Sequence, residues 1–258
     1  MNYFFIFVLS LTLFSCSSGV NLNLFSIEED KEFGKKVAAE IESDPKFKLL
    51  DSVQHQEVYS YIYKIRNEIL ESGNVKHKEN FDWRIRIIHD DSTLNAFCTP
   101  GGYIYVYTGI LKFLDSEDQL AGIMGHEIAH ADLRHSTRQM TEMFGIQLIL
   151  ELIAGDSKSV KEITSGLIGL TFSRSHEKEA DAQSVNYLCP TKYNAAGGAG
   201  FFEKLIKKGD SNNPPVFLST HPDPGNRVEK FNSMKIEKGC TGTETYASEF
   251  KRIISKLP

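Results

Sequence analysis

Apolar residues at helical spacing mark the first two structured segments of the chain. One stripe runs over residues 33–41 and ends at Asp44-Pro45, and a second runs over residues 58–69 and ends near Gly73-Asn74. Apolar residues that recur every three or four positions line one face of an amphipathic helix, and Pro or Gly commonly follows its end. Both segments are therefore predicted to be helices that bury one face.

After residue 80 the period of the apolar positions changes to two. Trp83, Ile85 and Ile87 alternate with arginines, which is the pattern of a half-buried strand. Pro100-Gly101-Gly102 is a turn sequence, and the aromatic and β-branched run Tyr103–Tyr107 predicts a further strand. The chain therefore combines its helices with a small sheet.

The second half of the chain is predicted to be mainly helical. Ser116 to Gln119 matches a capping box, which predicts the start of a helix. Further helices are predicted over residues 175–188, around residues 197–202 and over residues 246–257. No linker after residue 26 is long enough to divide domains, so the expected fold class is α+β, mainly helical with a small β-sheet.

The stretch from Met143 to Ala154 is strongly apolar and is broken by Gly155-Asp156-Ser157. A core helix is the favoured interpretation of this stretch. A lid over a cleft, or a surface that touches a membrane or a membrane protein, also fits an apolar run of this length. The sequence leaves these alternatives open.

The N-terminus has the pattern of an export signal. Tyr3–Phe14 is almost wholly apolar but is shorter than the roughly 20 residues that cross a bilayer. Leu13-Phe14-Ser15-Cys16 resembles a bacterial lipoprotein signal, in which the Cys is lipidated and becomes the new N-terminus. We therefore expect a signal peptide over residues 1–15, a lipidated tether over residues 16–26 and a single domain over residues 27–258. An ordinary cleaved signal is the alternative.

Composition and charge narrow the class of protein further. The 258 residues are 41% hydrophobic, which is enough for a sizeable core. The net charge is −5 and no long basic run occurs, so no electrostatic feature of the chain favours nucleic-acid binding.

Three cysteines remain after Cys16. Cys189 and Cys240 both lie beside turn-forming residues, and an exported protein can form disulfides, so we expect these two to pair. Cys98 would then be a free thiol. Three buried free thiols are the alternative, because connectivity does not follow from sequence.

The segment His126-Glu127-Ile128-Ala129-His130 has the pattern H-E-x-x-H. On a helix, residues four apart point from the same face, so both imidazoles can reach one Zn²⁺ at about 2.0–2.1 Å. Glu127 lies on the flank of that face, where it can act as the general base on a zinc-activated water. The pattern predicts a catalytic site with one zinc ion per chain.

A catalytic zinc site needs a third protein ligand. The metzincin pattern requires Gly at position 133 and His at position 136, and Leu133 and Ser136 exclude it. His135 is five residues past His130 and should face elsewhere, so we expect it at the surface. The third ligand must therefore come from further along the chain.

The predicted helix over residues 175–188 offers three acidic residues. Glu177 and Asp181 share its apolar stripe and should face inward, whereas Glu179 falls on the polar side. Buried carboxylates are costly unless they are compensated. We therefore expect Glu177 to be the third zinc ligand, and Asp181 to accept a hydrogen bond that orients His126 or His130.

Several motifs follow one another in a fixed order along the chain. They are Asn95-Ala96-Phe97, Pro100-Gly101-Gly102, the H-E-x-x-H segment, Glu177-x-x-Ala180-Asp181 and Ser219-Thr220-His221-Pro222. Together they resemble the CAAX prenyl protease/HtpX-like family of zinc metallopeptidases, specifically its soluble periplasmic lipoprotein branch. The resemblance runs from about Asn23 to the C-terminus. Cys98 departs from it, because a small apolar residue is expected there.

The resemblance implies a zincin-like metallopeptidase fold whose sheet borders the active-site cleft. The strand that begins at Tyr103 should offer its edge to the substrate backbone, unless it is a core strand with no free edge. His221 should approach the zinc, where it would either stabilise the oxyanion or occupy the fourth zinc position and keep the enzyme latent. Asn95 and Arg227 are expected near the cleft, although Arg227 fits a solvated helix residue equally well.

The resemblance also implies a function. We expect a zinc metalloendopeptidase that hydrolyses unfolded or misassembled cell-envelope proteins in the periplasm of a diderm bacterium, lipid-anchored to the outer or inner membrane. The alternative is a periplasmic chaperone or assembly factor for outer-membrane proteins, with a latent protease gated by His221. Glu127 argues against a zinc-binding pseudoenzyme, because a structural zinc site has no use for a base. The oligomeric state stays open.

Overall fold

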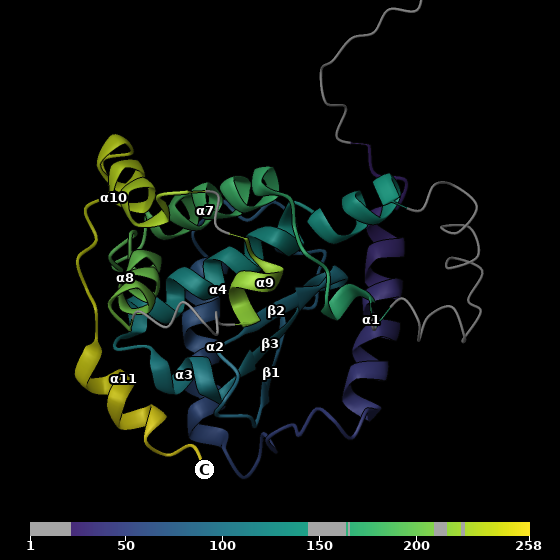
Figure 1. Ribbon diagram of the computed structural model, residues 1–258, viewed down its shortest axis with the longest axis horizontal. Helices are drawn as coiled ribbons and strands as arrows, with labels where there is room; N and C mark the ends of the chain where they lie inside the picture. Colours follow the sequence, from purple (N-terminus) through teal and green to yellow (C-terminus); the bar gives the residue numbers. More distant parts are fainter. Residues whose placement is uncertain (1–21, 144–163, 165, 209–215, 223–224) are drawn as a thin grey trace, which may run out of the picture.

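The computed structural model, which describes residues 22–143, 164, 166–208, 216–222 and 225–258, surrounds a three-stranded sheet with helices (Figure 1). The N-terminal half contains α1 (Ile27–Ser43), α2 (Gln56–Leu70), β1 (Arg84–Ile88), β2 (Ala96–Thr99), the 3-10 helix η1 (Pro100–Gly102), β3 (Tyr103–Tyr107) and α3 (Thr108–Phe113). The remainder contains α4 (Glu117–Asp132), α7 (Arg174–Leu188), α8 (Gly198–Lys208), α9 (Val216–Thr220), α10 (Arg227–Glu237) and α11 (Ala247–Ile254). The expected mainly helical α+β fold is confirmed.

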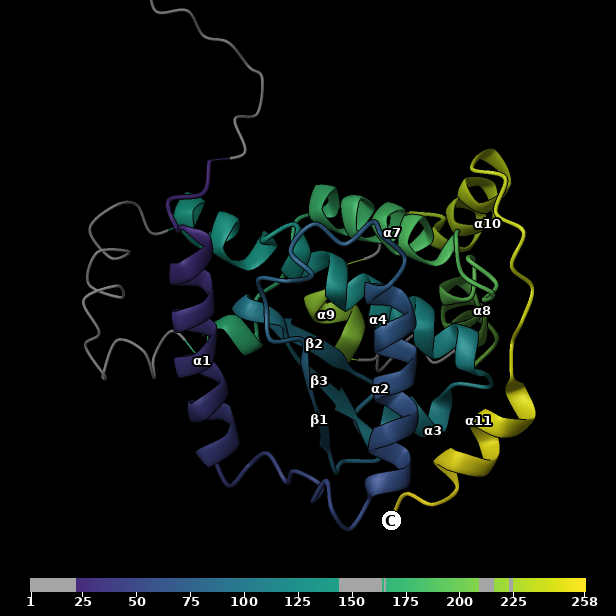
Figure 2. The ribbon, with the colours of Figure 1, turned by 180° about the vertical axis from the view of Figure 1, so that it is seen from behind.

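The two N-terminal helices lie where the apolar stripes predicted them, and they flank the strands in Figure 2. Ser26 begins α1 with a capping box, in which Glu29 N donates to Ser26 Oγ at 3.2 Å and Ser26 N donates to Glu29 Oε2 at 2.6 Å. α1 buries its apolar stripe in a small core with Phe97 and Tyr105. α2 buries its stripe in the main core. The sheet is therefore covered by helices that the local pattern specifies.

The strand order is β1-β3-β2, so β3 is the central strand. It pairs in parallel with β1, from Arg84 opposite Tyr103, and antiparallel with β2, from Ala96 opposite Val106. The prediction that the strand starting at Tyr103 offers a free edge is therefore wrong, because both of its edges are already hydrogen bonded. In the described sheet, β2 is the strand beside α4 that has a partner on one side only.

The helix α4 runs through the centre of the molecule and packs very closely on α7 and α8. A Cβ at Gly122 would lie 2.3 Å from Gly198 N, and one at Gly125 would lie 2.8 Å from Ser184 Oγ. Ser184 Oγ also donates to Gly122 O at 2.8 Å. Gly125 therefore lets α7 approach α4 closely enough for their polar side chains to meet, and Gly122 does the same for α8.

Ser116 is the N-cap residue of α4, as predicted, but the predicted capping box does not form. Ser116 Oγ donates instead to Asp118, and Gln119 Oε1 accepts from Asp115 N at 2.9 Å. The sequence therefore located the start of the helix correctly and assigned its hydrogen bonds wrongly.

Two predicted segments lie outside the described residues. They are the signal peptide with Cys16 and nearly all of the apolar stretch after Met143. Met143 is the last residue described before this stretch; it belongs to a helical segment that begins at residue 135 and is 57% exposed. Within the described ranges, no helix is both long and apolar enough to cross a bilayer.

Candidate metal centre

The facing surfaces of α4 and α7 bring three buried polar side chains together. His126 and His130 lie one turn apart on α4, and Glu177 lies in the first turn of α7. Ser173 caps α7 by accepting a hydrogen bond from His176 N at 3.1 Å, which fixes where that first turn begins. The three side chains are at most 1% exposed. The helix periodicity and the cap therefore place them against one another.

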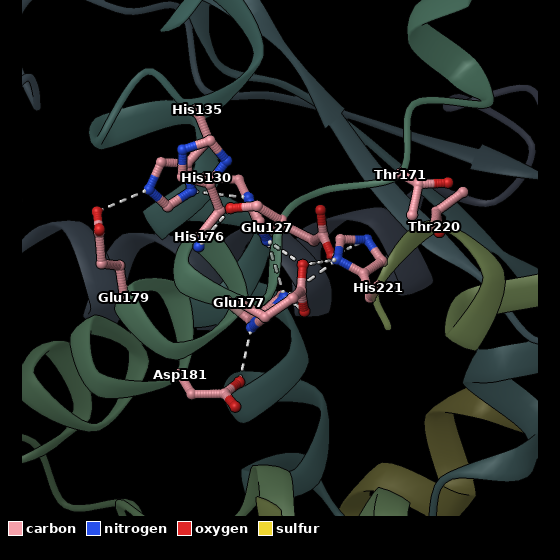
Figure 3. A network of polar contacts seen from close by, with 12 residues as sticks. Glu127, His130, His135, Thr171, His176, Glu177, Glu179, Asp181, Thr220 and His221 are labelled. Carbon is pink, nitrogen blue, oxygen red and sulfur yellow. Dashed lines mark hydrogen bonds and ion pairs between the residues drawn. The ribbon is translucent and has the colours of Figure 1, made fainter. Parts of the chain in front are cut away.

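The distances between the ligand atoms of these residues match those in the coordination shell of a bound metal ion. Figure 3 shows His130 and Glu177 in this arrangement. His126 Nε2 lies 3.0 Å from His130 Nε2 and 3.4 Å from Glu177 Oε2, and Glu177 Oε1 lies 3.3 Å from His130 Nε2. His221 Nδ1 joins them, 3.2 Å from His126 Nε2 and 3.0 Å from Glu177 Oε1. Ligand atoms around a tetrahedral Zn²⁺ are about 3.3 Å apart when each lies 2.0–2.1 Å from the metal.

The residues also fit zinc by their chemistry. Three imidazole nitrogens and one carboxylate are a common donor set for Zn²⁺, and all four atoms lie within 4.8 Å of one another. Glu177 Oε2 is buried and accepts no hydrogen bond from the residues described, and its ion pair with Arg227 Nη1 at 3.4 Å compensates part of its charge. His126, His130 and Glu177 would hold the ion, with His221 at the fourth position.

Asp181 lies directly behind His126. Its Oδ1 is 2.9 Å from His126 Nδ1, and it lies one turn after Glu177 on α7. A carboxylate at Nδ1 fixes the proton on that nitrogen, so Nε2 carries the lone pair that faces the cluster. The structure therefore assigns Asp181 to His126 rather than to His130.

Arg227 holds Asp181 in place from the start of α10. Its Nε donates to Asp181 Oδ2 at 2.9 Å, and a second guanidinium nitrogen donates to Oδ1. The guanidinium also lies 4.1 Å from the centre of the Phe202 ring, and the residue is 3% exposed. The alternative that Arg227 is a solvated helix residue is wrong.

His135 is the clearest error of the sequence interpretation. It is fully buried, its Nδ1 lies 2.9 Å from His130 Nδ1, and its Nε2 lies 3.3 Å from Glu179 Oε2. α4 ends at Asp132, the backbone turns at Arg134 with φ at 59°, and a new helix starts at residue 135. Extrapolating the phase of α4 past its end therefore gave the wrong direction for His135.

Glu127 is buried beside the cluster. Its carboxylate forms an ion pair with His221 Nε2 at 3.5 Å and also interacts with the buried Cys98 thiol, whereas no N–H or O–H group among the described residues donates a hydrogen bond to either oxygen. Burial raises the pKa of Glu127, although His221 and His126 partly offset this. A buried carboxylate of raised pKa beside the cluster has the properties of a general base.

His221 follows α9 directly and reaches the cluster from the side opposite α7 in Figure 3. Its backbone N–H donates to Phe217 O at 2.8 Å, and its ring stacks on Phe217 at 4.4 Å. Thr171 Oγ1 donates to Ser219 O at 3.0 Å, which ties the end of α9 to the segment before α7. The sequence predicted that His221 approaches the metal, and the structure places it there.

The surroundings of His126, His130 and Glu177 shift the pKa of each of these groups. Burial alone would raise the pKa of Glu177, but the His126 and His221 rings outweigh burial and hold that pKa well below its usual range. Burial opposes charge on His126, yet Glu177 and Asp181 raise its pKa to about 9. Burial lowers the pKa of His130 well below its usual value. Metal binding would therefore release a proton, mainly from His126.

Asn95 follows Leu94, whose carbonyl accepts a hydrogen bond from Phe217 N of α9 at 3.2 Å, so its expected position near the cleft stays a prediction. Asn95 precedes β2 and is 3% exposed, and its Oδ1 has no hydrogen-bond partner among the described residues. Tyr103 packs in the small core against α1 and donates to Asp82 Oδ2 at 2.5 Å, so the structure gives it a packing role. Cys98 is a buried free thiol on β2.

Cys189 and Cys240 form a disulfide, so the alternative of three free thiols is wrong. Cys189 is the C-cap residue of α7, and Cys240 follows the end of α10. The bond therefore joins the ends of the two helices that carry Glu177 and Arg227.

Sequence comparison gives a family. Peptidase family M48 matches residues 57–235 of the chain. The mitochondrial metalloendopeptidase OMA1 of Schizosaccharomyces pombe is 26% identical over 213 residues, which cover 81% of this chain and 61% of that protein. OMA1 of Arabidopsis thaliana is 34% identical over 185 residues, covering 66% of this chain and 37% of the relative.

A further relative is a bacterial protease. The beta-barrel assembly-enhancing protease of Escherichia coli (strain K12) is 30% identical over 157 residues, which cover 55% of this chain and 32% of that protein. The chain therefore spans less than two thirds of the length of each of these three relatives.

Proposed function

The chain belongs to peptidase family M48, and on that premise we propose that it is a zinc-dependent endopeptidase. The observation that carries the proposal is the buried cluster of His126, His130 and Glu177, whose ligand atoms lie 3.0–3.4 Å apart with the buried Glu127 carboxylate beside them. A structural zinc site would have no use for that carboxylate. The family relatives named as metalloendopeptidases support the same class of reaction.

The reaction follows from the roles that the residues can take. A bound zinc ion polarises the scissile carbonyl and lowers the pKa of water. Glu127 takes the proton of the attacking water and later delivers it to the leaving amine, which its raised pKa suits. Asp181 and Arg227 keep His126 in the tautomer that can bind metal.

His221 gives the site a closed form. A catalytic zinc site keeps one coordination position open, whereas here His221 Nδ1 faces the same point as the other three donors. We propose that His221 occupies the substrate position and keeps the peptidase latent. The alternative role, stabilisation of the oxyanion, requires the ring to withdraw from the other donors by enough to admit a substrate oxygen.

The proposed substrates are polypeptides in extended form. β2 has a partner on one side only in the described sheet and lies beside α4, but all four of its residues are buried, so a substrate backbone could pair along it, with little dependence on side chains, only after this edge is uncovered. Such recognition suits unfolded or misassembled proteins. The name of the Escherichia coli relative supports cell-envelope proteins as targets, and also supports the second candidate function, an assembly factor whose protease is gated by His221.

We also propose a periplasmic location, with Cys16 lipidated and the domain held near the outer or inner membrane of a diderm bacterium. The apolar segment before Cys16 supports export, and the Cys189–Cys240 disulfide suits an oxidising compartment. Mass spectrometry of the mature N-terminus tests this proposal, because a free or unprocessed Cys16 would contradict it.

The decisive experiment measures zinc content and casein cleavage on the full chain in mild detergent. We expect one zinc per chain, and in the His221→Ala background, where the proposed block is removed, Glu127→Gln should lower cleavage at least 100-fold while zinc is retained. Glu203→Gln, an exposed position on α8, is the matched control. Absence of zinc would contradict the proposal.

His221→Ala separates the two candidate roles of this residue. A rise in casein cleavage shows that His221 blocks the site, and a fall shows that it serves the oxyanion. Zinc binding without cleavage in the wild type, followed by cleavage in His221→Ala, supports the gated assembly factor.

A further inference from the structure

A second group of buried polar residues lies behind His130, on the side opposite His221 in Figure 3. His130 Nδ1 is 2.9 Å from His135 Nδ1, and His135 Nε2 is 3.3 Å from Glu179 Oε2. Arg138 donates to the same Glu179 oxygen at 3.2 Å. These contacts form a continuous chain from the metal cluster to a carboxylate.

The position of one proton decides the direction of every hydrogen bond in this chain. Two imidazole nitrogens 2.9 Å apart share one proton, so one of them donates and the other accepts. If His130 Nε2 presents its lone pair to a metal, the proton of His130 lies on Nδ1 and is donated to His135. The proton of His135 then lies on Nε2, where Glu179 accepts it.

We infer that His135 and Glu179 are positioning residues for the metal centre, which fix the tautomer and the ring orientation of His130. The inference rests on the proposed zinc site and deepens it. It assigns a role to two residues that the sequence pattern placed on the surface or on the polar face of a helix.

The arrangement parallels the one behind His126. There Asp181 accepts from His126 Nδ1 and is held by Arg227, whereas here Glu179 acts through His135 and is contacted by Arg138. Both carboxylates lie on α7, two residues apart. The difference is exposure, because the Asp181 side chain is 3% exposed and that of Glu179 is 38% exposed. Solvent therefore competes for Glu179, and His135 should matter more than Glu179.

The fold holds the His135 ring rigidly. Arg134, in the left-handed conformation, forms an ion pair with the buried Asp30 of α1 and so fixes the turn before His135. The His135 ring stacks on His176 at 4.4 Å with an angle of 18° between the planes. Phe172 stacks on His130 at 4.0 Å. Neither imidazole can rotate without breaking these contacts.

The test compares the zinc dissociation constants of variants by competition with a chromophoric chelator. His135→Phe keeps a ring against His176 but removes both nitrogens, and it should weaken zinc binding by about 10–100-fold. His135→Asn retains an acceptor at the position of Nδ1 and should bind zinc more tightly than His135→Phe. Glu179→Gln should weaken zinc binding less than His135→Phe does. In the His135→Phe background, Glu179→Gln should not weaken zinc binding further. His89→Phe and Glu203→Gln, both exposed, are the matched controls.

A second measurement needs no variant. Long-range ¹H–¹⁵N NMR of the zinc-loaded wild type, with ¹⁵N-labelled histidine, reports which nitrogen of each ring carries the proton. We expect His130 to be protonated on Nδ1 and His135 on Nε2. A proton on Nδ1 of His135, or a zinc affinity unchanged in His135→Phe, overturns the inference while the zinc site stands. A wild type that binds no zinc overturns the proposed function itself.

Discussion

Asp181 Oδ1 lies 2.9 Å from His126 Nδ1, and both groups are buried at the contact between α7 and α4. The carboxylate therefore decides which nitrogen of His126 is available to a metal. Arg227 closes the arrangement by donating to both carboxylate oxygens. Three elements distant in the sequence thus determine the chemistry of one imidazole.

Replacing Asp181 should weaken zinc binding. Asp181→Asn removes the charge that favours a proton on His126 Nδ1 and takes one of two carboxylate partners from Arg227, so we expect the zinc dissociation constant to rise about 10–100-fold. Chelator competition measures the change. Asp44→Asn, at the exposed C-cap of α1, is the control, and equal affinities of the two variants would contradict the assignment.

Removing zinc should destabilise the fold. The four facing donors have been brought together in a buried site, so an ion that binds only the folded state adds about 4 kcal/mol at 1,000 times its dissociation constant. For a chain of this length that corresponds to a fall in melting temperature on the order of 10 °C in the presence of a chelator. Differential scanning calorimetry measures it. In Glu177→Gln, the chelator should lower the melting temperature much less. A wild-type melting temperature that does not change with chelator would argue against a structural contribution from the metal.

Removing the disulfide should lower stability. Cys189 and Cys240 are 51 residues apart, and closing a loop of that length reduces the entropy of the unfolded chain by about 4 kcal/mol as an upper figure. We expect the Cys189→Ser/Cys240→Ser double variant to lose about 2–4 kcal/mol in chemical denaturation. Peptide mapping without reductant should recover the 189–240 pair from the wild type. A pair that includes Cys98 would contradict the structure.

Acid should weaken the hydrogen bonds that Asp132 accepts at the end of α4. Asp132 is buried, and although burial alone would raise its pKa, hydrogen bonds from His77, Tyr187 and Lys76 N outweigh burial and lower it. Because the pKa is lower in the folded state, the stabilisation is present above the unfolded value of about 3.9 and is lost as the pH falls below it.

Asp132→Asn isolates this contribution. At pH 7 the variant should be about 1–3 kcal/mol less stable, because buried donors lose a charged acceptor. The gap between wild type and variant should shrink as the pH falls from 5 to 3, when both are measured by urea denaturation in chelator. A gap independent of pH would show that Asp132 is not ionised by these contacts.

Local patterns predicted most elements of this fold. Helix stripes located α1 and α2, the period-two run located β1, and turn residues located the start of β3. They did not predict which strand lies at the edge, because the alternation of side chains describes the two faces of a strand and says nothing of its neighbours. The supposed edge strand is the central one for that reason.

Among the residues of the metal centre, too, the sequence predicted some positions correctly and others wrongly. Spacing on a single helix determined that His126 and His130 share a face and that Glu177 and Asp181 share another, because α-helical geometry is the same in every context. The interpretation failed for His135, where α4 ends at Asp132 and the phase of one helix no longer applies to the next.

The sequence by itself therefore predicted most elements and three of the donors, His126, His130 and Glu177, since these depend on the geometry of a single helix or strand, whereas His221 was implied by the family resemblance. The partner of each donor was decided only by the tertiary structure. Asp181 contacts His126 rather than His130, Arg227 is buried rather than solvated, and His135 meets Glu179, because α7 and α10 dock on α4 through contacts between residues far apart in the chain. No periodicity within one segment contains that information.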